Sequence, residues 1–100
     1  MASNMTTETK SSIGLNQINV QSVVEAVEGT SGMEFFDSEA QSAIYQFTLK
    51  ALDFIKDRNS RDRAREVTDA LNMVEEANGS KSLAIEVLCR AVAIRQDLEK

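Results

Sequence analysis

Apolar residues recur with helical spacing through most of the chain between residues 38 and 98. They repeat at intervals of three and four residues in three successive stretches, at about 39–57, 61–78 and 82–98, which places them along one side of a helix in each stretch. The 100-residue chain has no proline and only four glycines, so few residues interrupt these stretches. The pattern therefore predicts an all-α fold in a single domain.

Two of these stretches contain more apolar residues than one face of a helix can hold. In both 39–57 and 82–98, a second apolar strip adjoins the main stripe when positions are laid out at about 100° per residue. The residues of these strips are Tyr45, Leu49, Leu52, Ile85, Cys89 and Val92. The middle stretch, 61–78, has a single apolar stripe opposite a charged side. It can therefore cover one face of the pair formed by the other two helices, but not both faces. We therefore expect the extra strips to be covered either by the segment 13–28 or by another chain.

The part of the chain before residue 38 is less clearly patterned. A helix at about 15–28 is predicted by the spacing of Val20, Val23, Val24 and Val27, although β-branched residues also leave a strand over 18–24 open. Residues 1–12 are polar and lack periodicity, which is typical of a disordered tail. Short connections between the helices favour antiparallel neighbours. Residues 13–100 are thus expected to form a small three- to four-helix up-down bundle.

Polar residues and glycines mark the expected ends of the helices. Ser38, followed three residues later by Gln41, matches the capping box of a helix N-terminus. Gly79 is expected to end the third helix in the left-handed conformation, and Ser80 or Ser82 to cap the fourth.

The net charge of −5 is unevenly distributed along the chain. Residues 13–55 contain six acidic residues and one basic residue, whereas residues 56–100 contain nine of each. An acidic surface disfavours nucleic acid and anionic membranes and favours a basic partner. The simpler interpretation is that the charge keeps a small protein in solution.

The composition argues against catalysis and against bound cofactors. The chain has no histidine, so the usual proton shuttle near neutral pH and the commonest metal ligand are both absent. No glycine-rich phosphate loop occurs, and no stretch has the roughly 18 apolar residues of a membrane span. Cys89 is the only cysteine, which predicts a small core residue in a reducing compartment. We expect a cytoplasmic non-enzyme without cofactor, metal or small-molecule substrate.

One basic concentration lies around the turn before residue 61. Its arginines are Arg58, Arg61, Arg63 and Arg65. Several guanidinium groups near a helix N-terminus could bind an acidic partner. A solvated turn with ion pairs within the helix is the favoured interpretation, and nucleic-acid binding is the least favoured because the chain is acidic overall.

The favoured function is a non-catalytic protein-interaction module, either self-associating as a homo-oligomer or binding a partner helix. The chain is typical of many small bacterial or phage helical proteins, and no motif indicates a particular family. The residues predicted for the interface are Phe35, Phe36, Tyr45, Leu49, Leu52, Ile85 and Val92. The alternative is an acidic inhibitor of the antitoxin or immunity type. That protein would bind a basic target through Glu25, Glu28, Glu34, Asp37 and Glu39.

Overall fold

A computed structural model of the chain describes residues 18–56 and 61–98. Its elements are the helix α2 (Val20–Glu28), the short 3-10 helix η2 (Met33–Phe35), and the helices α3 (Ser38–Lys56), α4 (Arg61–Glu76) and α5 (Lys81–Leu98). The described residues contain no strand, and residues 20–24 are helical, so the all-α prediction is confirmed. The predicted tail at 1–12, the expected start of the first helix at 15–17, and Arg58 lie outside the described residues.

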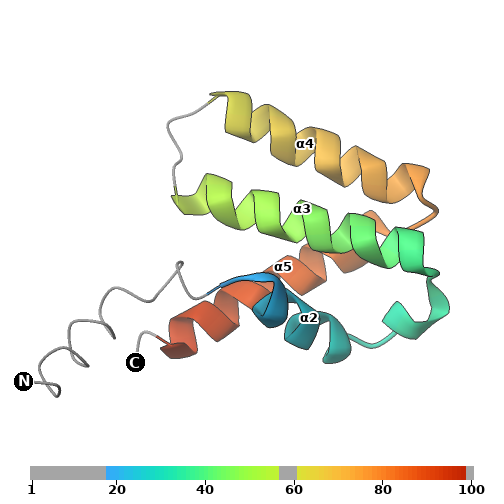
Figure 1. Cartoon of the computed structure of the whole chain (residues 1–100), viewed down its shortest axis with the longest axis horizontal. Coiled ribbons are helices and arrows are strands. Elements are labelled where there is room, and N and C mark those ends of the chain that lie inside the picture. The colour runs from blue at the N-terminus through green and yellow to red at the C-terminus, as the bar shows by residue number, and fades with distance from the viewer. Residues whose placement is uncertain (1–17, 57–60, 99–100) are drawn as a thin grey trace, which may run out of the picture.

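The helices form a small bundle in which α3 contacts every other α-helix (Figure 1). α3 and α4 lie side by side and run in opposite directions, as their short connection predicts (Figure 1). α5 runs obliquely behind and below α3, and α2 packs against both α3 and α5 (Figure 1). Within the described residues, no helix is long and apolar enough to cross a membrane.

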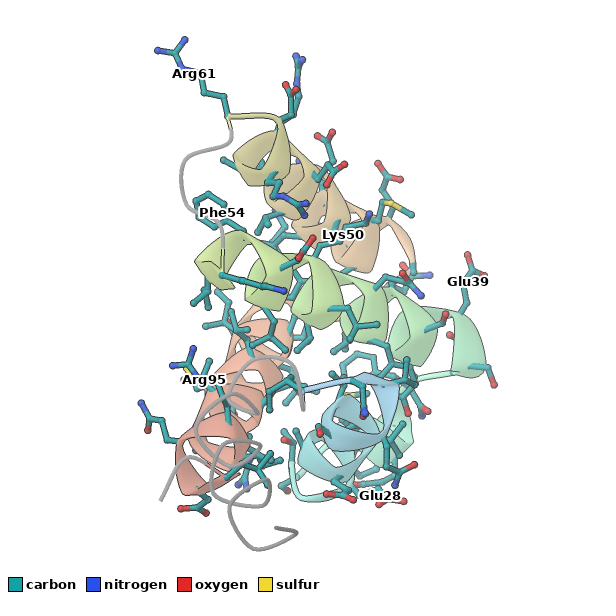
Figure 2. All side chains as sticks on the ribbon, turned by 60° about the vertical axis from the view of Figure 1, so that its left-hand side comes forward. Glu28, Glu39, Lys50, Phe54, Arg61 and Arg95 are labelled. Carbon is teal, nitrogen blue, oxygen red and sulfur yellow. The ribbon has the colours of Figure 1, made fainter. Side chains whose placement is uncertain are left out.

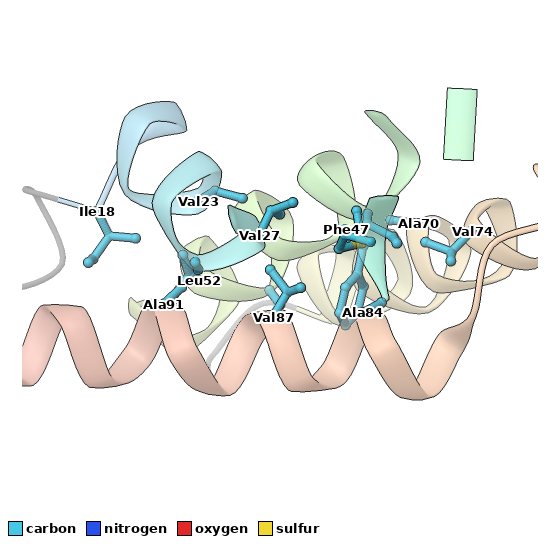
Figure 3. Close-up of a cluster of buried hydrophobic side chains, with 14 residues drawn as sticks. Ile18, Val23, Val27, Phe47, Leu52, Ala70, Val74, Ala84, Val87 and Ala91 are labelled. Carbon is cyan, nitrogen blue, oxygen red and sulfur yellow. The ribbon is translucent and has the colours of Figure 1, made fainter. Parts of the chain in front are cut away.

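The core lies where α2, α3 and α5 meet and continues between α3 and α4 (Figure 3). Valine and alanine side chains dominate it, and small residues such as Ala84 and Ala91 let α5 approach its neighbours closely. The largest fully buried side chain is Ile44 of α3. In Figure 3 the labelled core side chains lie along one side of α5, which places that helix at the edge of the core.

The N-termini of α2, α3 and α5 are capped by side chains that accept backbone hydrogen bonds. Asn19 caps α2 by accepting from the Ser22 amide at 3.2 Å, and Ser80 caps α5 by accepting from the Leu83 amide at 3.2 Å. The expected capping box at Ser38 is wrong. Asp37 caps α3 instead, because its Oδ1 accepts from the Ala40 amide at 2.9 Å. A carboxylate also suits the positive end of a helix better than a hydroxyl does.

The turn between α4 and α5 corrects the expected role of Gly79. The left-handed residue is Asn78, with φ of 63°, whereas Gly79 is not among the residues with positive φ. Glycine is needed at 79 for a different reason. A Cβ atom there would lie 2.9 Å from both Val74 Cγ1 and the Val74 carbonyl oxygen. The Gly79 amide also donates to that carbonyl at 2.8 Å, so the turn is tightly closed against α4.

Candidate interaction surface

The second apolar strip of α3, made of Tyr45, Leu49 and Leu52, is largely covered within the chain. Leu52 is only 4% exposed and belongs to the core, so it cannot reach a partner in this fold. Its expected place in an interface is corrected for that reason. Tyr45 and Leu49 are half-buried and pack against the core cluster.

Segments that precede α3 in the sequence supply this cover. Tyr45 lines a groove of about 290 Å³ together with Val24 and Val27 of α2. Leu49 and Leu52 line another groove, of about 470 Å³, together with Ile18. The part of the 13–28 segment that the structure describes therefore covers this strip, which is one of the two sources of cover expected from the sequence.

α5 carries an uncovered counterpart, which we call the outer stripe. It consists of the exposed, uncharged residues Ser82, Ile85, Cys89, Ala93 and Gln96. Ile85 is 47% exposed, and Cys89 is exposed and unpaired. The prediction of Cys89 as a core residue is therefore wrong. The cause is that Ala84, Val87 and Ala91 supply the buried side of α5, which turns residue 89 away from the core.

The residues of the outer stripe follow one another at intervals of three, four, four and three residues, which keeps them on one side of the helix, as in a helix–helix contact. Val92 lies beside it and is half-buried against the core. Ser82 and Gln96 were absent from the predicted interface because they are polar. Their spacing from Ile85 and Cys89 was the signal that could have identified them.

Charged residues flank the outer stripe along one edge. Glu86 and Arg90 lie on this edge, and their closest charged atoms are 4.0 Å apart, with both side chains about half exposed. Such a pair contributes little to stability. Arg90 also reaches the C-terminal end of α2, where a Cβ atom at Gly29 would lie 3.3 Å from its Nη1 atom.

A second exposed apolar residue, Phe35, stands on the η2 turn and is 86% exposed. Its neighbours hold the turn in place. Met33 is buried in the core, Phe36 packs against the core, and the Gln41 side chain donates to the carbonyl oxygens of Met33 at 3.2 Å and Phe36 at 2.8 Å. Phe35 and Phe36 thus serve different roles, one facing solvent and the other packed inward.

The acidic residues proposed for a basic target are all exposed. They are Glu25, Glu28, Glu34, Asp37 and Glu39. No basic residue occurs between Ile18 and Leu49, so these acids are not neutralised within their own part of the chain. In Figure 2, Glu28 lies at the bottom of the view and Glu39 at its right, whereas Arg61 projects from the N-terminal end of α4 at the top.

The arginines of the basic turn are not gathered around one site among the described residues. Arg61 and Arg65 are exposed on α4, and Arg63 forms an ion pair with Asp53 of α3. The Arg63–Asp53 pair thus joins two helices, which differs from the ion pairs within one helix expected from the sequence, and residues 57–60 lie outside the described residues.

The described part of the chain holds no group of three or more side chains that could bind a metal ion. Comparison with known proteins adds no relative: neither a protein-family model, nor a curated protein, nor a solved structure matches the chain.

Proposed function

We propose that this chain is a non-catalytic protein-interaction module that binds its partner through the outer stripe of α5. The observation that carries the proposal is the run of exposed, uncharged residues along the full length of one helix. Exposed apolar side chains that occur singly need no explanation, but an aligned set along one helix favours a docking face.

Two further features of the chain support this proposal. The absence of histidine leaves few routes to acid–base catalysis near neutral pH. The thiol of Cys89 is exposed and unpaired, which suits a reducing compartment, and we propose a cytoplasmic location on that basis.

Cys89 provides a direct test because it is the only cysteine and lies in the middle of the outer stripe. The thiol is labelled with a benzophenone maleimide, and the labelled protein is irradiated in an extract of its source cells. We expect cross-linked adducts, identified by mass spectrometry, that disappear when Ile85→Glu is added.

The matched control moves the label to another helix. In the Cys89→Ser background, Asn72→Cys places the only thiol on the exposed side of α4. We expect no comparable adducts from position 72. Equal adducts from both positions, or none from position 89, would contradict an interface on α5.

A second candidate function is the acidic inhibitor, supported by the exposure of Phe35 next to the exposed acids Glu34 and Asp37. An aromatic side chain on a fixed turn can anchor a complex, and an acidic surround accelerates association with a basic protein. For this candidate, the association rate with a basic target should fall steeply as salt concentration rises. Association through α5 should depend much less on salt.

A further inference from the structure

We infer that the outer stripe of α5 binds α5 of a second copy, with the two helices antiparallel about a two-fold axis at the height of residue 88. This inference rests on the proposed function, because it names the partner of the same surface. It is carried by three properties of α5: the distribution of large and small residues, the placement of charges along one edge, and the length of the exposed stripe.

The sizes of the side chains suit an antiparallel self-pair. Ile85 is the only large apolar side chain in the outer stripe, and Cys89 and Ala93, one and two turns further on, are small. In an antiparallel pair centred at the height of residue 88, Ile85 of each copy lies between the small residues Cys89 and Ala93 of the other copy. A large residue then packs against small ones at both ends of the contact. A parallel pair would instead place the two Ile85 side chains at the same height and the small residues opposite each other, leaving the contact poorly filled.

The charges on the flanking edge favour the same arrangement. Under the two-fold axis, this edge of one copy faces the same edge of the other. Glu86 then lies at the height of the partner's Arg90, and Arg90 lies at the height of the partner's Glu86. Within one copy the two charged groups are 4.0 Å apart and half exposed, so both remain accessible to the opposite copy. On the other edge, Lys81 approaches the partner's Arg95, but its charge is met by Glu75 at 3.5 Å.

The length of the stripe sets the strength of the contact. α5 has 18 residues, which corresponds to about 27 Å of helix. Two single helix faces of this length bury a total area on the order of 1,000 Å², at the small end of specific interfaces. We therefore expect a reversible dimer with a dissociation constant on the order of 10 to 100 µM.

Sedimentation equilibrium over protein concentrations that span this range tests the pairing. We expect wild type to change from monomer to dimer, and Ile85→Glu to weaken the dimer about 100-fold, because the two-fold axis applies the change twice. Met73→Glu is the matched control, since Met73 is an exposed apolar residue on α4, 54% accessible to solvent. It should leave the dissociation constant unchanged, and an equal loss in both variants would overturn the inference.

The antiparallel direction has its own test in the Cys89→Ser background. Ile85→Cys and Ala93→Cys proteins are mixed and treated with a short bismaleimide. We expect cross-links between positions 85 and 93 to exceed those between two copies of position 85. The reverse order would indicate parallel helices and overturn the proposed geometry.

Charge exchange gives an independent check of the same geometry. Glu86→Arg should weaken the dimer about tenfold, and the double variant Glu86→Arg/Arg90→Glu should restore the affinity of wild type. Failure of the double variant to restore it would contradict the cross-chain pairing of these two residues.

The failure of this inference can be told apart from the failure of the proposed function. If the chain stays monomeric at the highest concentration while labelled Cys89 captures a different protein, the second copy is excluded and the interface on α5 stands. If it stays monomeric and Cys89 captures nothing, both are overturned.

Discussion

α3 and α5 share a pattern in sequence but differ in the folded chain. Each carries a second apolar strip beside its main stripe. On α3 the strip is covered by α2 and Ile18, whereas on α5 Ile85 and Cys89 remain exposed. Excess apolar surface on a helix is thus covered inside the chain in one case and left exposed in the other. The same pattern can mark a core or an interface, and only packing separates them.

The sharpest test of this difference places the same charge in both strips. Leu52→Glu buries a carboxylate at a core position that is 4% exposed, and we expect it to lower the free energy of unfolding by about 3–5 kcal/mol. That is a large part of the stability of a small domain. Ile85→Glu, at a position 47% exposed, should change it by less than about 1 kcal/mol. Urea denaturation followed by circular dichroism measures both values, and equal losses would remove the distinction between the strips.

A substitution in the turn between α4 and α5 should have the next largest effect on the free energy of unfolding. Gly79→Ala brings a methyl group within 2.9 Å of the Val74 side chain and carbonyl oxygen. Since Val74 is fully buried, it cannot move aside freely. We therefore expect the substitution to lower the free energy of unfolding by about 1–3 kcal/mol. The matched variant Asn78→Gly suits the left-handed conformation and should be nearly neutral. Thermal denaturation of the two variants tests this account. A larger loss of stability in Asn78→Gly than in Gly79→Ala would contradict it.

The two helices also differ in how their N-termini are capped. Asp37 caps α3 at 2.9 Å and Ser80 caps α5 at 3.2 Å. Asp37→Ala and Ser80→Ala should each lower the free energy of unfolding by about 1 kcal/mol. This corresponds to a decrease in melting temperature of roughly 4–8 °C for a domain of this size. Ser38→Ala is the control and should have little effect. A larger loss at Ser38 than at Asp37 would restore the capping box expected from the sequence.

The sequence predicted the helices well because their stripes are long and regular. α4 begins at Arg61, and α3 and α5 each begin one residue before their predicted starts. The errors concern local choices between adjacent residues. Asp37 rather than Ser38 caps α3, and Asn78 rather than Gly79 is left-handed. Both residues of the first pair can cap a helix, and both residues of the second can adopt the left-handed conformation. The packing of the neighbouring segments decides which residue of each pair does so.

The candidate surface was only half predictable. Helical periodicity placed Tyr45, Leu52 and Ile85 in second strips beside the main stripes, but it cannot say which segment will pack on them. The burial of Leu52 depends on α2 and Ile18, which lie more than twenty residues earlier in the chain. Cys89 was assigned to the core because its sequence neighbours are apolar, although its direction on the helix points it to solvent.

The hydrogen bond from the Gly79 amide to Val74 also bears on how long the chain stays chemically intact. In an asparagine–glycine sequence, the glycine nitrogen can attack the asparagine side-chain amide, closing a succinimide ring and releasing ammonia. Here that nitrogen donates to the Val74 carbonyl at 2.8 Å, next to a backbone held at φ of 63° at Asn78. Attack therefore requires the turn to open first. Slow conversion of Asn78 to aspartate or isoaspartate during storage would then report how often the end of α4 unravels.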